Sequence, residues 1–300
     1  MKQTDLWRVG VVKAPLSKIV AAQSIADMET VWLPAGESLQ YMADPFGLWQ
    51  AGRLYVFVES FDYRTRRGGI DAIVLDENCS IIERRAILRE PWHLSYPFVF
   101  EADDQIWMLP EAWKSGRLSL YRAIEFPWRW ERDKRFDFPA AAIDPTPICV
   151  GDEWWLFYTP PAADKQLRWS VLKLARAPHL LGPWRELELP PVLRTLDGGR
   201  MGGTPFKQGD TWLLPTQDCR QSYGAATLIR RIADPAHPRE VSSTGIHIQA
   251  PASSAPYDRG LHTLSAVGDW TLVDVKREVP SWHRLGVDVA RHLGAYRARG

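Results

Sequence analysis

The chain has 300 residues, a net charge of +1 and a hydrophobic fraction of 45%. A charge so close to zero gives no reason to expect binding to nucleic acid or to an anionic membrane surface. No apolar run approaches the length of a membrane span, and residues 1–5 lack the apolar core of a signal peptide, so a cytoplasmic location is expected. The 3 cysteines, Cys79, Cys149 and Cys219, form no metal-binding pattern and are expected to be buried thiols.

The first elements along the chain are a strand and a helix. Residues 6–12 alternate in hydrophobicity, which is typical of a strand, and a short helix is expected within residues 14–31. After residue 40 a longer motif begins and then recurs.

This motif consists of two short strands joined by a tight turn. Each copy starts with an extended run, passes through a turn that contains Gly or Asp, and returns as an aromatic-rich strand. Where a proline opens the run, the residue before it is expected to be extended, because proline disfavours helix at that position. The copies begin at Asp44, Tyr96, Asp144, Thr204 and His262.

The spacing within and between the copies indicates a ring of similar sheets. In the first three copies, the proline lies 14 positions before the residue that ends the second strand. Successive copies start roughly 50 to 60 residues apart, a period typical of propeller blades. Chance similarity between short strands is the alternative, but turn, aromatic strand and spacing recur together. We therefore predict an all-β fold, a five-bladed β-propeller.

A ring of this size would use nearly the whole chain, so residues 1–300 are expected to form a single domain. Residues 233–259 are rich in Pro, Ser and Ala and are expected to be a long connection. The strand at residues 6–12 is expected to close the ring by pairing with a final strand near residues 285–289, which would remove an exposed sheet edge. The predicted blades span approximately residues 41–90, 91–140, 141–195, 200–240 and 258–290.

In a propeller, the first strand of each blade starts at one mouth of the central channel, and the antiparallel second strand ends at the same mouth. Polar residues at these positions are therefore expected to converge, although they lie far apart in the sequence. The set comprises Asp44, Glu59, Tyr96, Glu111, Asp144, Thr159, Thr204, Gln217, Asp218, His262 and Asp274, with His93 just before Tyr96.

Clustered carboxylates repel one another, so at least one is expected to have a raised pKa. A protonated acid beside an ionised one is what cleavage of a glycosidic bond requires: one donates a proton, and the other activates water or attacks. The chain has 15 tryptophans, some of which would serve as stacking platforms for sugars.

Each of these residues also has a purely structural interpretation. An aspartate before a proline can cap a turn, a glutamate can pair with an arginine, an acid can be a solvated loop residue, and a histidine can belong to the core. Asp44 and Asp144 could be such turn caps, and Glu59 and Glu111 could pair with Arg53 or Arg200. Asp218 could be the solvated loop acid, and His262 could be the core histidine.

The blade pattern resembles that of five-bladed glycoside hydrolases of the arabinanase and xylosidase group. The motifs behind this are Asp44-Pro45-Phe46, Asp144-Pro145-Thr146 and the Leu-Gly-Pro-Trp sequence that ends at Trp184. Over residues 6–290 the chain looks closer still to the N-terminal propeller domain of glucosamine inositolphosphorylceramide transferases. That likeness rests on residues 93–101, 108–111, 215–219 and 260–264.

The resemblance to the hydrolases implies roles for several residues. Asp44 matches the base of that group, Asp144 the aspartate that tunes the pKa of the acid, and His262 a histidine near the channel. The chain departs from the group at the start of the fourth blade, where Gly203-Thr204 stands in place of the glutamate that acts as general acid. Glu111 or Asp218 would have to replace that acid.

Three functions remain open: a carbohydrate-active enzyme that hydrolyses or transfers a glycosyl unit, a non-catalytic glycan-binding propeller, or a sugar-modifying transferase of another kind. The expected ligand is a carbohydrate and no cofactor is expected. No metal ligand is assigned, and whether a metal sits in the channel stays open. The expected partner is a glycosyltransferase or a formyltransferase-like protein. The catalytic candidates are Asp44, Asp144, Glu111 and Asp218. The substrate-binding candidates are Glu59, His93, Tyr96, Trp113, Arg200 and His262.

Overall fold

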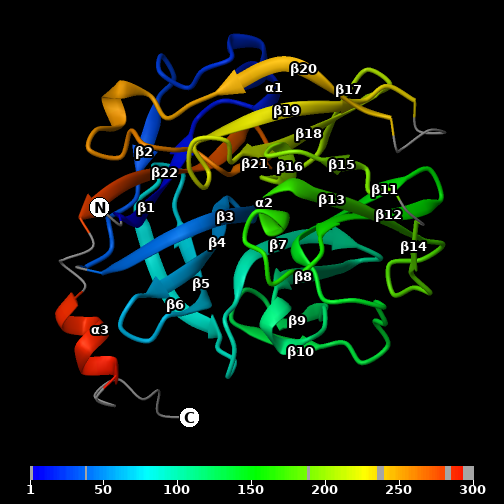
Figure 1. Cartoon of the computed structure of the whole chain (residues 1–300), viewed down its shortest axis with the longest axis horizontal. Coiled ribbons are helices and arrows are strands. Elements are labelled where there is room, and N and C mark those ends of the chain that lie inside the picture. Colours follow the sequence, from blue (N-terminus) through cyan, green and yellow to red (C-terminus); the bar gives the residue numbers. More distant parts are fainter. Residues whose placement is uncertain (1–2, 38, 188–189, 235–239, 281–284, 293–300) are drawn as a thin grey trace.

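The computed structural model of the chain describes residues 3–37, 39–187, 190–234, 240–280 and 285–292. Its strands form five antiparallel sheets set around a common centre, which confirms the predicted five-bladed β-propeller (Figure 1). None of the helices in this described part is long and apolar enough to cross a membrane.

The first three blades follow the chain in order. Blade I contains β3 (Gln40–Gln50), β4 (Arg53–Asp62), β5 (Arg67–Leu75) and β6 (Ile81–Leu88). Blade II contains β7 (Ser95–Ala102), β8 (Gln105–Glu111), β9 (Tyr121–Glu125) and β10 (Arg129–Arg132), with the short helix η1 (Trp113–Ser115) after β8. Blade III contains β11 (Ile143–Val150), β12 (Glu153–Thr159), β13 (Val171–Ala177), β14 (Arg185–Glu186) and β15 (Leu193–Arg194), with α2 (Leu167–Ser170) before β13.

The last two blades depart in part from the sequence prediction. Blade IV contains β16 (Asp197–Met201), β17 (Phe206–Gln208), β18 (Thr211–Asp218), β19 (Ala226–Ile232) and β20 (Val241–Ile248). The predicted connection at residues 233–259 was wrong in part, because it contains β20 and the short helix η2 (Ala252–Ser254). Strand β20 covers the outer edge of β19, an edge that would otherwise be unpaired.

Blade V joins the two ends of the chain. It contains β21 (Leu264–Val267), β22 (Trp270–Pro280), β1 (Gln3–Val12) and β2 (Thr30–Trp32), and α1 (Leu16–Ala22) lies between β1 and β2, within the predicted helical region. The N-terminal strand was predicted, but its partner is β22, paired along its whole length. The expected final strand at residues 285–289 was wrong: that segment belongs to helix α3 (Leu285–His292), which lies outside the ring of sheets (Figure 1).

Tight two-residue turns join the two inner strands of each blade, as the Gly and Asp signals predicted. The strand ends that pair across them include Gln50 with Arg53 and Val150 with Glu153. In the first turn both central residues, Ala51 and Gly52, have positive φ angles, which matches the right-handed twist of the flanking strands.

A bulge interrupts the first strand of blades I, II and III at the same place. The register shifts next to Asp44, Tyr96 and Asp144, and these residues have φ angles of 50°, 47° and 46°. The expectation of an extended residue before each proline was therefore wrong for these three. A bulge leaves one residue unpaired in the ladder and re-aims its side chain, so the three bulges place these residues at the channel.

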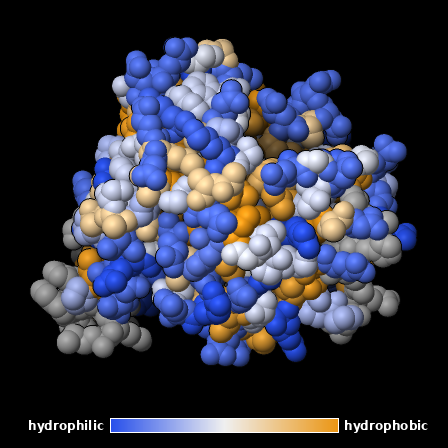
Figure 2. Space-filling model, turned by 90° about the horizontal axis from the view of Figure 1, so that it is seen from above, coloured by the Kyte–Doolittle hydropathy of each residue, from blue (hydrophilic) through white to orange (hydrophobic). Residues whose placement is uncertain are grey.

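Apolar side chains fill the spaces between adjacent blades. One cluster joins blades V and I through residues such as Val9, Val56 and Leu272, all fully buried. Figure 2 shows hydrophilic side chains over most of one face, with hydrophobic ones gathered toward its middle. Of the cysteines, Cys79 and Cys219 are buried as expected, but Cys149 is exposed because it lies near the outer end of β11.

Blades IV and V approach so closely at Gly203 that no side chain fits there. A Cβ atom at this position would lie 1.9 Å from the Leu264 carbonyl oxygen, and φ is 136°. Gly203→Ala is therefore expected to lower the free energy of unfolding by more than about 3 kcal/mol, since the backbone must shift as well as adopt a strained conformation.

Gly209→Ala is the matched control. This turn glycine also has a positive φ of 61°, but nothing lies within 4 Å of the position that a Cβ atom would take, so its cost is expected to be about 1 to 2 kcal/mol. Urea unfolding measures both. Equal losses for the two variants would show that the blades do not meet closely at Gly203.

Candidate functional site

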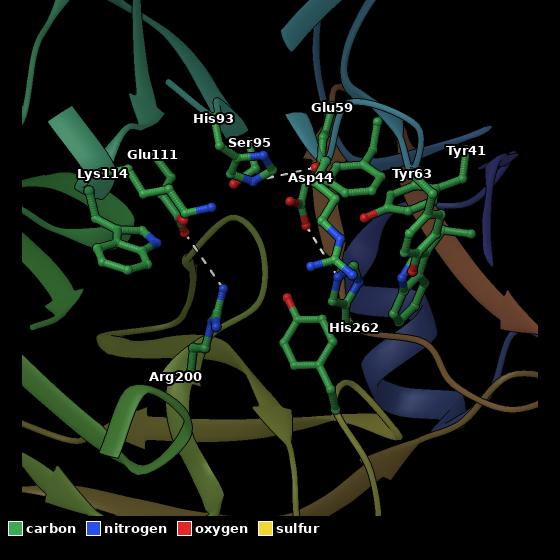
Figure 3. A pocket seen from close by; sticks show the side chains of 15 residues that line it. Tyr41, Asp44, Glu59, Tyr63, His93, Ser95, Glu111, Lys114, Arg200 and His262 are labelled. Carbon is green, nitrogen blue, oxygen red and sulfur yellow. Dashed lines mark ion pairs between the residues drawn. The ribbon is translucent and has the colours of Figure 1, made fainter. Parts of the chain in front are cut away.

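A cavity of about 340 Å³ opens at one mouth of the channel and brings together most of the predicted site residues (Figure 3). Those that line it are Asp44, Glu59, His93, Glu111, Trp113, Arg200 and His262. They come from blades I, II, IV and V, so residues separated by more than 200 positions in the sequence meet there, as the ring arrangement predicted.

The wall of the cavity toward blades I and V is a buried cluster of Asp44, His262 and Asp274. His262 Nδ1 lies 2.8 Å from Asp274 Oδ1, and His262 Nε2 lies 3.4 Å from Asp44 Oδ1. Asp274 also accepts hydrogen bonds from the backbone N–H groups of Asp44, His262 and Thr263. The indole of Trp7 stacks on the His262 ring at a centroid distance of 3.8 Å.

These contacts set the charges of the cluster. Burial raises the pKa of Asp44 to about 6, opposed by the neighbouring His262 and reinforced by Asp144 and Asp274. For His262, burial opposes the charged form, but Asp274, Asp44 and Asp144 outweigh it and raise the pKa. With a pKa of about 6, Asp44 is largely ionised at neutral pH, and the neighbouring His262 favours its charged form.

The ligand atoms of Asp44, His262 and Asp274 lie within 4.8 Å of one another, which is close enough to hold a metal ion. The same atoms, however, already bind each other or backbone N–H groups. A cation bound through His262 Nδ1 would have to replace the contact of that atom with Asp274, and the hydrogen bonds present fit an ion pair between these two residues.

A second cluster lies toward blades II, III and IV. Arg200, on β16, makes a bidentate ion pair with Asp144, in which one of the two hydrogen bonds measures 3.0 Å. Gln217 donates a hydrogen bond of 2.9 Å to Asp144 as well. Asp144 itself lies beneath the cavity rather than in its lining, fully buried, and breaking this pair would leave an uncompensated buried charge at a cost of about 3 to 5 kcal/mol.

Glu111 lines the cavity next to this pair. Its Oε2 atom accepts a hydrogen bond of 3.3 Å from the Asp144 backbone N–H and lies 3.6 Å from Arg200 Nη2. Burial and the charge of Asp144 raise its pKa well above the usual range, and Arg200 opposes this shift. The predicted contact between Glu111 and Arg200 is thus present.

Glu59 and His93 lie next to each other, on the side of the cavity opposite Arg200 (Figure 3). His93 Nε2 lies 3.5 Å from Glu59 Oε1. Burial, with repulsion from Asp44 and Glu111, raises the pKa of Glu59 well above the usual range. The pKa of His93 falls to about 4, because burial and the positive charges of Lys114 and Arg200 disfavour the imidazolium.

Tyr96 lies deeper than predicted. It is fully buried, and its hydroxyl contacts Thr146 Oγ1 at 3.0 Å and accepts a hydrogen bond of 3.0 Å from the Gly203 N–H. Its ring therefore ties blades II, III and IV together below the cavity, and it is absent from the lining.

Two residues predicted to reach this mouth lie elsewhere. Asp218 lines a separate polar cavity, where Arg220 holds its carboxylate through hydrogen bonds of 3.0 and 2.8 Å. Burial alone would raise its pKa, but the Arg220 hydrogen bonds lower it, so it is a poor proton donor. Thr204 lines a cavity that contains Phe46, Phe98 and Trp154 instead.

Residues that the sequence analysis did not select complete the lining, and all but Ser95 are aromatic or cationic: Trp7, Tyr41, Phe61, Tyr63, Arg66, Ser95, Lys114 and Tyr223. Trp7 and Tyr63 come from a strand in the closing blade and a turn in blade I, positions that the repeat does not mark. Tyr223 follows β18, and Arg200 lies over its ring at 5.2 Å. The one sequence signal for Tyr223 is its position shortly after the second strand of a blade, the position that Trp113 has in blade II.

The low pKa of His93 predicts a pH dependence of stability. The unfolded chain binds a proton at His93 below pH 6.5 and the folded chain only below about 4, so this residue contributes stability above pH 6.5 that is lost as the pH falls toward 4. His93→Asn should remove this contribution. The free energy of unfolding of the wild type, minus that of the variant, is expected to fall by up to about 3 kcal/mol as the pH is lowered from 7 to 4.

Urea unfolding at pH 7, 5.5 and 4.5 measures this difference. Asparagine at position 93 retains a side-chain acceptor for the Gly68 N–H, which the histidine uses in the wild type. A stability difference that does not change with pH would contradict a neutral, buried His93.

The family model described as "Glucosamine inositolphosphorylceramide transferase 1, N-terminal" matches residues 14–244. The protein named glucosamine inositolphosphorylceramide transferase 1 from Oryza sativa subsp. indica is 34% identical over 204 residues, which cover 66% of this chain and 27% of the relative. Its counterpart from Arabidopsis thaliana is 29% identical over 201 residues, covering 66% and 26%. The chain thus spans about a quarter of the length of these relatives.

Solved structures of glycoside hydrolases share the fold. The family 62 α-L-arabinofuranosidase of Coprinopsis cinerea has a TM-score of 0.58 at 12% identity, covering 81% of this chain and 93% of the other. A GH43_1 enzyme from Xanthomonas citri has a TM-score of 0.56 at 13% identity, covering 81% and 88%. At such low identity these structures show the common fold alone, whereas the family match covers most of the sequence. The chain belongs to the family of the N-terminal domain of glucosamine inositolphosphorylceramide transferase 1.

Proposed function

We propose that the mouth of this propeller binds a glycan and breaks or transfers a glycosidic bond. The observation that carries the proposal is the set of buried carboxyl groups around one open cavity: Asp44, Glu59 and Glu111 line it, and each has a raised pKa. Perturbed carboxyl groups gathered in one cleft indicate acid–base chemistry. The names of the family and of the hydrolases that share the fold agree with a sugar ligand.

Asp44 is suited to act as the base. It is largely ionised at neutral pH, held by the Tyr96 N–H and the Thr263 hydroxyl, and it faces the cavity. In this role it removes a proton from water, or from the hydroxyl of an acceptor sugar, as that oxygen attacks the anomeric carbon. His262, fixed by Asp274 and stacked on Trp7, holds the charge of Asp44 in place.

The reaction also needs a proton donor for the departing oxygen. Asp218 is excluded from this role by its place in another cavity. The donor is then one of the protonated glutamates, Glu59 or Glu111, which approach the cavity from neighbouring blades.

Aromatic rings around the acids provide the surface that a sugar needs. Trp7, Tyr41, Trp113 and Tyr223 line the cavity, and aromatic faces stack on the apolar faces of sugar rings. Lys114 and Arg200 add donors for hydroxyl groups at the same mouth. A pocket with a few polar groups set among rings is typical of small-ligand sites.

A second candidate function is glycan binding without catalysis. The observation that favours it is the start of blade IV, where Gly203-Thr204 supplies no acid to this cavity and Arg200 locks Asp144 in a bidentate pair. In that case the propeller would present a glycan to a glycosyltransferase. The relatives are named as transferases, but this chain matches about a quarter of their length, so their activity is part of the proposal.

An array of immobilised glycans followed by mass spectrometry of the products tests the proposal. We expect Asp44→Asn to retain binding but to lose product formation by at least about 100-fold, because general-base catalysis contributes on that order. Asp152→Asn, which removes an exposed acid in a turn of blade III, is the matched control and should leave the rate unchanged.

Turnover by Asp44→Asn at the wild-type rate would remove Asp44 from the mechanism. Glycan binding by the wild type with no product from any bound glycan would contradict catalysis and support the binding function instead.

A further inference from the structure

In the described part of the chain, no lysine or arginine forms an ion pair with Glu59 in its corner of the cavity. The residue is only 5% exposed, and its Oε1 atom has no hydrogen-bond partner among the described residues. Leaving a buried polar atom without a partner costs about 1 to 3 kcal/mol. Because Glu59 lines the cavity, its unpaired carboxyl group requires an explanation, and a proton held by the group supplies one.

The neighbouring histidine is fixed in one tautomer. His93 Nδ1 accepts a hydrogen bond of 2.8 Å from the Gly68 N–H, so its proton lies on Nε2, the atom that faces Glu59 Oε1 at 3.5 Å. That separation is longer than a normal hydrogen bond. When Glu59 becomes a carboxylate, the Nε2–H group is the donor that can stabilise it.

Glycine at position 68 makes this geometry possible. A Cβ atom there would lie 2.7 Å from Glu59 Oε1 and 2.8 Å from His93 Cε1. Any side chain at this position would therefore separate the glutamate from the histidine.

Glu111, the other acid of the cavity, is in a different environment. It accepts the Asp144 N–H and lies near Arg200. Both contacts favour its carboxylate form, because hydrogen-bond donors and a nearby cation stabilise negative charge. Glu59 has neither contact and is the acid that better retains a proton until the substrate takes it.

We propose that Glu59 is the proton donor of the mouth and that His93 is its positioning residue; this rests on the proposed function. As the bond between the anomeric carbon and the glycosidic oxygen breaks, its electron pair stays on that oxygen, which receives the proton of Glu59. Water or an acceptor hydroxyl forms the new bond to the anomeric carbon and gives its proton to Asp44. Solvent then carries the proton from Asp44 back to Glu59.

Leaving-group dependence tests this assignment. Methyl and 2,4-dinitrophenyl glycosides of the sugars retained on the glycan array serve as probes, because dinitrophenolate departs without protonation and a methoxide does not. Glu59→Gln is expected to lose at least about 100-fold in kcat/KM on the methyl glycoside and less than about 10-fold on the dinitrophenyl glycoside. Glu111→Gln should affect both glycosides equally, and Glu77→Gln, at an exposed acid, should affect neither.

The positioning role of His93 has its own readout. His93→Gln is expected to lower kcat on the methyl glycoside with KM unchanged, and to shift the basic limb of the pH–rate profile. A variant that raises KM alone, or leaves the profile in place, would show that His93 has only a structural role.

Two outcomes separate the failure of this inference from failure of the proposed function. Suppose that the wild type cleaves the methyl glycosides. If Glu59→Gln then loses kcat/KM equally on both probes, or if Glu111→Gln loses more on the methyl than on the dinitrophenyl glycoside, Glu59 is not the donor although the site is catalytic. If the wild type cleaves no glycoside at all, the proposed function fails and this assignment fails with it.

Infrared difference spectra check the protonation directly: the carboxylic acid band near neutral pH should be smaller in Glu59→Gln than in the wild type, and an unchanged band would overturn the assignment.

Discussion

The site depends on a hydrogen bond that recurs from blade to blade around the channel. Each bulge frees a backbone N–H group from its ladder, and a side-chain carboxyl oxygen of the preceding blade accepts it: Asp274 accepts from Asp44, Asp44 from Tyr96, and Glu111 from Asp144. A buried N–H group without a partner would be costly. The acids are therefore part of the architecture as well as candidates for chemistry, because they satisfy the backbone at the point where the blades meet.

The same arrangement places more negative than positive groups in a small volume. Asp44, Glu59, Glu111, Asp144 and Asp274 are all buried, and the groups among them that oppose this negative charge are the guanidinium of Arg200 and the ring of His262, whose pKa these acids raise. Arg200 is committed to Asp144 and His262 to Asp274. The remaining imbalance raises the pKa of both glutamates and so favours their protonated form, the form that acid catalysis requires. Structure and proposed chemistry thus share one electrostatic cause.

Much of this was accessible from the sequence, because repetition carries information that single motifs lack. The Gly and Asp turns, the aromatic return strands and their constant spacing predicted the five blades, and the blade geometry predicted that Asp44, Glu59, Glu111 and His262 would converge. Asp218 fitted the same rule but lies elsewhere: Gln217, its neighbour in β18, reaches Asp144, and the next side chain of a strand points to the opposite face. Sequence spacing places a backbone position and leaves the direction of the side chain open.

Other features required the three-dimensional structure. The left-handed conformation of Asp44, Tyr96 and Asp144 opposes the usual preference before proline, and only the bulge in the sheet explains it. The C-terminal segment alternates like a strand but forms α3, since β22 already pairs with β1. Trp7 and Tyr63 reach the cavity from positions that the repeat does not mark. In each case tertiary contacts overrode a local preference.

Amide hydrogen exchange, followed residue by residue with NMR, tests most directly whether carboxylates hold the bulged backbone. We predict that the N–H groups of Asp44, Tyr96 and Asp144 exchange as slowly as those in the centre of strand β4, and that Asp274→Asn accelerates exchange at Asp44 in particular. Exchange at these three positions as fast as in the exposed turn at Gly209 would contradict this role of the carboxylates.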